Sequence, residues 1–247
     1  MQLTIDIGNT RTKLGLFRKN ELVEEAFMQS HTLTELLAFG KRKNVRHVIV
    51  SSVAAPDPGL LPGLLDSFQT MELTHETPLP FKNAYKTPLT LGKDRIAAVA
   101  GAHALYPEES CLVVDCGTCI KYEMLEAGGN YTGGNIAPGA AMRIKAMHHF
   151  TARLPEVDLA FPPDFIGSTT ITAMQNGALR GAALEIEGFA RLFAQKSGPL
   201  RVILTGGDAG FFYPVLRIPQ MSLEPSLTLT GLNNILLYNL NPHDPDF

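Results

Sequence analysis

The sequence opens with Met1-Gln2-Leu3-Thr4-Ile5-Asp6-Ile7-Gly8-Asn9-Thr10, and a similar stretch, Val114-Asp115-Cys116-Gly117-Thr118, follows near the middle of the chain. In both stretches apolar residues alternate with polar ones up to a glycine, which predicts a strand with one apolar face and a carboxylate near its end. The glycines permit tight turns, and the threonines after them place hydroxyl groups beside exposed backbone N–H groups. Two such turns suit a polyphosphate and its metal ion.

Length and composition indicate a globular protein. The 247 residues are 45% hydrophobic, enough for a substantial core in one large domain or two of ordinary size. The net charge is −3, from 21 basic and 24 acidic residues, so the electrostatics do not indicate a nucleic-acid partner. The N-terminus lacks a signal-peptide pattern, and no apolar run approaches the ~18 residues of a membrane span. We therefore expect a cytoplasmic protein with no membrane partner.

The three cysteines, Cys111, Cys116 and Cys119, cannot form a closed disulfide framework, and their clustering indicates a reducing compartment. Cys116 and Cys119 have the C-x-x-C spacing of a redox or zinc motif. A zinc site needs four ligands and no second such pair exists, while a redox pair needs a helix N-terminus. Here a strand pattern continues after the turn, so a structural role is favoured.

Strand and helix patterns alternate through the first half, which predicts an α/β fold. They are a hairpin over 1–17, a helix over 32–40, a strand over 45–53, an extended proline-containing surface segment over 75–91, and an Ala-rich helix over 96–105. Asp94 and Arg95 fall in the first turn of the last helix.

The second half repeats this beginning. The expected features are a hairpin from Cys111, a turn near Gly128-Gly129, a glycine-rich loop over 133–139, a helix from Ala140, a long helix capped by Thr169 or Thr170, a strand over 201–204, and a frayed tail over 241–247. Because each half starts with a hairpin that carries an acidic turn, we expect two duplicated halves, 1–110 and 111–247, with a cleft between them.

The two commonest nucleotide fingerprints, the P-loop and the Gly-x-Gly-x-x-Gly turn, are absent. A phosphate site must therefore be built from the hairpin turns. The N–H groups of Gly8, Asn9 and Thr10 can cradle phosphate oxygens, Lys13 can neutralise charge, and Asp6 can hold a hydrated magnesium ion. These parts fit phosphoryl transfer, which depends mostly on positioning and charge neutralisation.

Several motifs together carry a more specific signal. In order and spacing, the chain resembles the type III pantothenate kinases at 6–10, 92–95, 115–118, 133–139, 170–177 and 205–208. The resemblance implies the acetate and sugar kinase, Hsp70 and actin superfamily, with two ribonuclease-H-like halves and the nucleotide between them. It also implies ATP-dependent phosphorylation of pantothenate, the first step of coenzyme A biosynthesis, and a homodimer that shares its active sites.

The resemblance assigns roles to residues on the nucleotide side. It makes Thr118 an ATP contact and gives Gly206 and Gly207 to an adenosine-side loop. It places a monovalent cation, K⁺ or NH₄⁺, at Asp115. Asp6 remains the residue expected to hold Mg²⁺. The first phosphate loop comprises Asp6, Ile7, Gly8, Asn9, Thr10, Arg11, Thr12 and Lys13.

On the pantothenate side, Asp94 matches the family's proton acceptor for the hydroxyl that attacks the γ-phosphate. The planar fork of Arg95 suits a carboxylate or the polar chain of the substrate. Thr170 matches a threonine supplied by the partner subunit. The residues that this resemblance gives to substrate binding are Tyr85, Gly92, Lys93, Asp94, Arg95 and Thr170.

Plainer alternatives stand beside these roles. Asp6 could cap a turn, Asp94 and Thr170 could be helix N-caps, and Arg95 could be a solvated helix residue. Cys119 stands where the family usually has Ala, and Ser168-Thr169 replaces a Lys-Asn pair. For the whole protein, the alternatives are a non-enzymatic transcriptional accessory protein of the same fold and a superfamily kinase for another small substrate.

Overall fold

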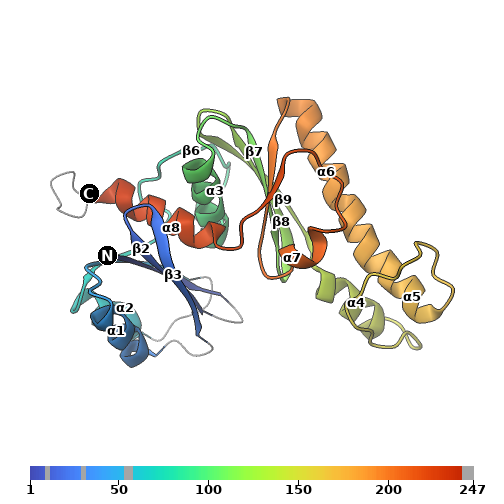
Figure 1. Ribbon diagram of the computed structural model, residues 1–247, viewed down its shortest axis with the longest axis horizontal. Coiled ribbons are helices and arrows are strands. Elements are labelled where there is room, and N and C mark those ends of the chain that lie inside the picture. The colour runs from blue at the N-terminus through green and yellow to red at the C-terminus, as the bar shows by residue number, and fades with distance from the viewer. Residues whose placement is uncertain (9–11, 29–31, 53–57, 241–247) are drawn as a thin grey trace. The chain divides into compact units, whose positions relative to one another are not determined.

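The computed structural model describes residues 1–8, 12–28, 32–52 and 58–240, which fold into two compact α/β units (Figure 1). Unit 1 comprises residues 1–108, 128–132 and 226–247, and unit 2 comprises residues 109–127 and 133–225. The predicted tail over 241–247 lies outside the described residues.

Unit 1 is built on a five-stranded mixed sheet with the order β3-β2-β1-β4-β5. Its elements are β1 (Gln2–Ile7), β2 (Thr12–Arg18), β3 (Glu21–Met28), α1 (Leu33–Arg42), β4 (His47–Ser52), α2 (Leu60–Leu65), β5 (Gln69–Glu72), β6 (Lys82–Asn83), a 3₁₀ turn (Pro88–Thr90), α3 (Lys93–Leu105) and α8 (Leu227–Asn239). The predicted hairpin is confirmed, since β1 and β2 pair antiparallel; so are the helix expected over 32–40, the strand expected over 45–53 and the helix that follows Asp94.

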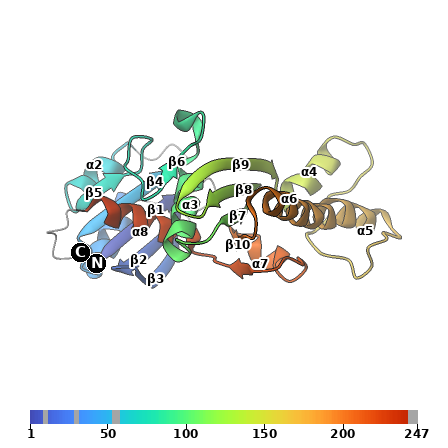
Figure 2. The same ribbon diagram turned by 90° about the horizontal axis from the view of Figure 1, so that it is seen from above.

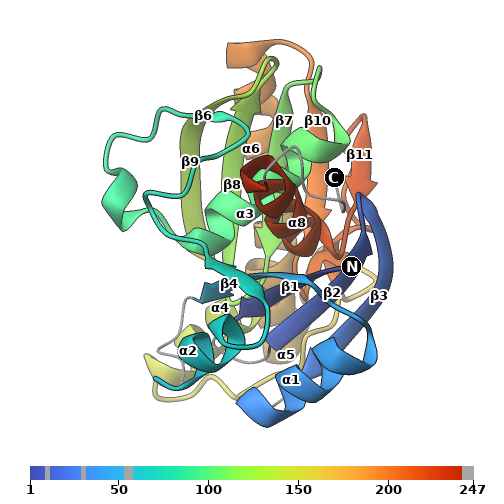
Figure 3. The same ribbon diagram turned by 90° about the vertical axis from the view of Figure 1, so that its left-hand side faces the viewer.

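Both faces of the unit 1 sheet are covered (Figure 3). Leu3, Ile5 and Ile7 of β1 pack with buried residues of α1 and α2 on one face. On the other face α8 contacts β1, β2 and β4, so Thr4 is completely buried as well. The predicted apolar face of β1 is confirmed, and a helix from the end of the chain covers the second face as well, where Asp6 stays half-buried near the strand end.

Unit 2 contains the second hairpin and the longest helix (Figure 2). Its elements are β7 (Cys111–Cys116), β8 (Cys119–Glu126), β9 (Asn130–Pro138, whose first residues belong to unit 1), α4 (Ala140–His149), α5 (Thr170–Gln175), a π-helical turn (Asn176–Arg180), α6 (Gly181–Ser197), β10 (Arg201–Thr205), α7 (Ala209–Phe212) and β11 (Met221–Leu223). Residues of α4, α6 and α7 form one buried core with β7, β8 and β10. The hairpin, the helix from Ala140, the capped helix and the strand over 201–204 agree with prediction.

Two features differ from the sequence expectations. The stretch 133–139 is mainly strand β9 instead of a loop, and at Gly134 a Cβ atom would overlap the backbone carbonyl of Tyr122 on β8. Glycine is used there for close strand approach. The second difference is the division of the chain, because α8 and residues 128–132 group with unit 1 and not with the half that starts at residue 111.

Candidate functional site

The first acidic turn places three polar side chains at neighbouring strand positions. Asp6, half-buried near the end of β1, lies opposite Lys13 on β2 and opposite Ser51 on β4. The Ser51 hydroxyl is buried and has no hydrogen-bond partner within the described residues. Ile7 and Thr12 are buried at the ends of the two strands. Of the predicted phosphate loop, Asn9, Thr10 and Arg11 lie outside the described residues.

The second acidic turn repeats this arrangement in unit 2. Asp115 lies opposite Lys121 on β8, and its carboxylate is 2.7 Å from the Lys121 ammonium group. On the other side Asp115 lies opposite Thr205 of β10, whose hydroxyl is buried and, like that of Ser51, without a partner among the described residues. Thr118 is exposed in the turn between β7 and β8. Each hairpin therefore offers a carboxylate and a lysine, and the neighbouring parallel strand adds a hydroxyl.

The loop after β10 lies directly against the second turn. Gly206 has φ of +93°, and a Cβ atom there would overlap the Asp115 carboxylate and the Cys116 carbonyl. Gly207 is exposed beside it. Asp208 donates its backbone N–H to the Cys116 carbonyl at 2.8 Å, and burial raises the pKa of the Asp208 carboxyl. The sequence motif contained Asp208, yet only its two glycines received a predicted role.

The predicted catalytic residue lies at the start of α3. Gly92 is the N-cap of this helix, so the alternative that Asp94 is the N-cap is wrong. Asp94 is half-buried, and its Oδ1 accepts a hydrogen bond from the Arg95 backbone N–H at 2.9 Å. Lys93 forms an ion pair with Glu72 at 2.9 Å, which ties the helix start to the end of β5. The carboxylate of Asp94 thus projects from a fixed first turn.

Arg95 is not a solvated helix residue, because it is only 6% exposed. Its guanidinium carbon lies 5.1 Å from the centre of the Tyr85 ring, and Nη1 donates to the Tyr85 hydroxyl at 3.4 Å. Nη2 donates to the hydroxyl of Tyr131 at 3.2 Å. The structure therefore brings together Tyr85, Asp94 and Arg95 in unit 1, and adds Tyr131, which the sequence interpretation missed.

Thr170 is the first helical residue of α5, and it is exposed. The N-cap is Thr169, whose hydroxyl accepts from the Thr172 N–H at 3.2 Å in a reciprocal capping box. Capping therefore explains Thr169 and leaves the exposed Thr170 hydroxyl available for another role.

Two of the three cysteines, Cys111 and Cys116, are buried, whereas Cys119 is half-buried. Burial raises the pKa of Cys111 to about 12 and that of Cys116 even further, which suppresses the reactive thiolate. Among the residues that the structure describes, no group of three His, Cys, Asp or Glu side chains is arranged to hold a metal ion. A metal at Asp6 or Asp115 would therefore need further oxygen ligands, from hydroxyl or backbone groups, a nucleotide or water.

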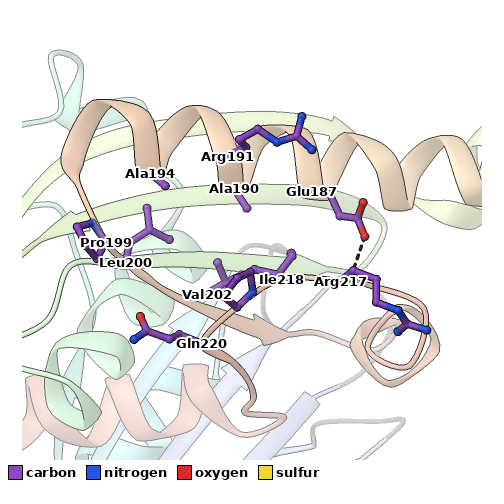
Figure 4. Close-up of a pocket in the computed structure, with 11 residues that line it drawn as sticks. Glu187, Ala190, Arg191, Ala194, Pro199, Leu200, Val202, Arg217, Ile218 and Gln220 are labelled. Carbon is purple, nitrogen blue, oxygen red and sulfur yellow. Dashed lines mark hydrogen bonds between the residues drawn. The ribbon is translucent and has the colours of Figure 1, made fainter.

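A pocket of about 490 Å³ in unit 2 contains none of these residues (Figure 4). Ala190 and Ala194 of α6 line it together with Leu200, Val202 and Ile218, and the Glu187 carboxylate accepts the Arg217 backbone N–H at 2.7 Å. None of the helices in the described part of the chain has the length and hydropathy of a membrane-spanning segment.

Comparisons with known proteins agree with the motifs. The family model of type III pantothenate kinase matches residues 2–192. A type III pantothenate kinase of Phocaeicola vulgatus is 41% identical over 240 residues, covering 97% of this chain and 99% of the relative. A solved structure described as a Baf family transcriptional activator from Campylobacter jejuni matches with a TM-score of 0.62 at 22% identity, covering 96% of this chain and 98% of that chain.

The ROK hexokinase from Thermus thermophilus matches with a TM-score of 0.51 at 16% identity, covering 95% of this chain and 96% of that chain. At such identities the two solved structures show the fold alone. These structures share the α/β fold of two units that the sequence predicted.

Proposed function

The chain belongs to the type III pantothenate kinase family, and we propose on this basis that it transfers the γ-phosphoryl group of ATP to pantothenate as the first step of coenzyme A biosynthesis. The observation that carries the proposal is the first turn of α3, where a half-buried Asp94 adjoins a buried, oriented Arg95. The 41% sequence identity with a type III pantothenate kinase over 97% of this chain supports the proposal. The likeness to a transcriptional activator concerns the fold only, so a non-enzymatic role is not favoured.

In the proposed reaction, the Asp94 carboxylate accepts the proton of the pantothenate hydroxyl as its oxygen attacks the γ-phosphorus. The new O–P bond forms while the bond between the γ-phosphorus and the bridging oxygen breaks, and ADP leaves. Arg95 orients the substrate through its planar fork, and Tyr85, Gly92 and Lys93 surround that end of the site.

The acidic turns fit the cations of such a reaction. Asp6 and Ser51 in unit 1, and Asp115 and Thr205 in unit 2, present oxygen atoms, the ligands that Mg²⁺ and K⁺ prefer. When bound, Mg²⁺ neutralises the charge that develops on the phosphoryl group. We propose Mg²⁺ at Asp6 and a monovalent cation at Asp115, with the rest of the loop 6–13, Thr118, Gly206 and Gly207 contacting ATP.

The surface around Thr170 favours a second copy of the chain as a partner. Large apolar side chains are exposed on α5, α6 and the segment before them, with exposed fractions of 71%, 65%, 51% and 62% for Phe165, Ile166, Ile171 and Leu184. Contiguous exposed apolar surface commonly marks a protein interface. We propose that this surface forms the homodimer contact and brings Thr170 to the partner's substrate.

The test is release of ADP by the purified chain, measured with and without pantothenate and with K⁺ replaced by Na⁺. We expect release that depends on pantothenate and K⁺, and a loss of about 10²–10⁴ in kcat for Asp94→Asn at unchanged folding. Near-normal kcat in that variant would refute the assigned base, whereas no pantothenate-dependent release by the wild type would refute the function.

The same variants test the shared site. Asp94→Asn and Thr170→Ala subunits, each weakly active alone, are unfolded, mixed and refolded together. If each site takes Asp94 from one subunit and Thr170 from the other, hybrid dimers contain one intact site and activity returns. An unchanged activity in the mixture, with hybrids verified by mass, contradicts the shared site.

A further inference from the structure

The buried guanidinium of Arg95 needs neighbouring groups that compensate its positive charge. Arg95 is 6% exposed, so most of its charged group has lost contact with water. A buried charge is costly unless hydrogen bonds or opposite charges compensate it. The orientation of the fork therefore depends on the groups that accept its hydrogen bonds.

Tyr131 is one of these acceptors and is held rigidly. Its side chain is completely buried, and its hydroxyl oxygen lies 3.2 Å from Nη2 of Arg95. Its backbone carbonyl accepts from the Ala84 N–H at 2.9 Å, where β9 pairs with β6. The ring stacks on Tyr85 at 6.2 Å and meets the edge of Phe81 at 6.2 Å.

Tyr85 and Tyr131 contact different parts of the same guanidinium. Tyr85 offers its ring at 5.1 Å from the guanidinium carbon and a hydroxyl 3.4 Å from Nη1, while Tyr131 accepts the shorter bond from Nη2. Tyr85 is half-buried, so substrate can displace it, whereas the buried Tyr131 cannot be reached. The Tyr131 hydroxyl therefore affects the substrate through Arg95 and not by direct contact.

We propose that Tyr131 is a positioning residue, whose hydroxyl fixes the Arg95 fork in the orientation that binds pantothenate. The inference rests on the proposed function, since it assigns the effect of Tyr131 to pantothenate and not to ATP. A hydrogen bond to a charged group contributes enough to binding that its loss weakens affinity about 10-fold or more.

The experiment compares Tyr131→Phe with the wild type in the ADP-release assay. We expect KM for pantothenate to rise about 10-fold, while KM for ATP changes less than about 2-fold. The matched control is Tyr122→Phe, which also removes a completely buried hydroxyl bonded to a charged group, here the Glu185 carboxylate at 2.9 Å in unit 2. This control should leave KM for pantothenate unchanged.

A double-mutant cycle separates positioning from a general structural effect. Pantothenate binding is measured by calorimetry for Tyr131→Phe, Arg95→Ala and the double variant. Because Tyr131 acts through Arg95, its substitution should change the pantothenate Kd less than about 2-fold in the Arg95→Ala background.

Three results would overturn the inference. They are an unchanged KM for pantothenate in Tyr131→Phe, an equal rise in both KM values together with a lowered Tm, and a full effect of Tyr131→Phe without Arg95. In all three cases a wild type that phosphorylates pantothenate leaves the proposed function intact. A wild type that does not phosphorylate pantothenate removes both.

Discussion

The two units share one strand order but differ in the connections on which the proposed substrate residues lie. The order β3-β2-β1-β4-β5 of unit 1 corresponds to β9-β8-β7-β10-β11 of unit 2. In both, the first strand pairs antiparallel with the second and parallel with the fourth, which in turn pairs parallel with the fifth. The carboxylate and lysine also correspond, as Asp6 and Lys13 in one hairpin and Asp115 and Lys121 in the other.

The candidate substrate residues do not correspond in the same way. In unit 1 they lie between β5 and the first turn of α3, whereas in unit 2 Thr170 lies in the long connection from β9 to β10. The duplicated strands thus carry a similar carboxylate and lysine, whereas the proposed substrate residues lie on connections that the duplication does not repeat.

The largest effect expected from comparing the two units tests whether the similar acidic turns bind different cations. Asp6→Asn should lower kcat by about 10²–10³, at all potassium concentrations, because it removes the carboxylate that we propose to hold Mg²⁺. Asp115→Asn should instead abolish the dependence of the rate on K⁺. The measurement is kcat as a function of K⁺ concentration for both variants.

Lys121→Met is the control for this comparison. It breaks the 2.7 Å ion pair with Asp115 but keeps the carboxylate. If it abolishes the potassium dependence as completely as Asp115→Asn does, the ion pair and not the carboxylate is responsible. Identical potassium profiles for Asp6→Asn and Asp115→Asn would show that the two turns do not divide the cations.

The elements that were predicted from sequence are those with strong local patterns. Alternating apolar residues identified both hairpins, and the Thr169 cap follows from the local polar pattern. Helix α8 was not predicted because it is apolar on most sides, as its buried residues Leu227, Leu232 and Ile235 show. A helix enclosed by α3 and a sheet needs no polar face, so it lacks the amphipathic period.

Long-range contacts explain the remaining failures. The glycines of 133–139 suggested a loop. Their role depends on the close approach of Gly134 to Tyr122 on β8, a contact between residues that are not neighbours in the sequence. Asp94 and Arg95 could be proposed as site residues because their motif is continuous in the sequence. Tyr131 was missed because its link to Arg95 arises from the pairing of β6 with β9, which no local pattern encodes.

An intermediate effect on stability is expected where helix α8 packs against helix α3. A Cβ atom at Gly231 would overlap the Ala97 carbonyl and lie 2.6 Å from the Gly101 nitrogen. Gly231→Ala should therefore destabilise the protein by about 1–3 kcal/mol, since backbone cannot move away cheaply. Thermal unfolding should show a Tm lower by about 2–12 °C.

Gly188→Ala in α6 of unit 2 is the matched substitution. Nothing lies within 4 Å of a Cβ atom at that position, so the higher helix propensity of alanine should stabilise the protein by about 0.5–1 kcal/mol. Opposite signs of the two Tm changes support the close helix crossing. A Tm drop of equal size for both variants would contradict it.

The smallest expected effect concerns Asp208, which follows β10 of unit 2. Burial raises its pKa in the folded state above the ordinary value of 3.8. Below that value both states are protonated, and as pH rises the unfolded state loses the proton first, so the contribution of this group to the free energy of unfolding falls through the window above pH 3.8. Asp208→Asn removes this cost and should raise Tm slightly at pH 7, with the gain shrinking as pH approaches 3.8. Two results would contradict this prediction: a Tm difference that is constant from pH 4 to pH 7, or a lowered Tm of the variant at pH 7. Either result would show that the loop after β10 in unit 2 compensates the negative charge of Asp208 better than burial alone predicts.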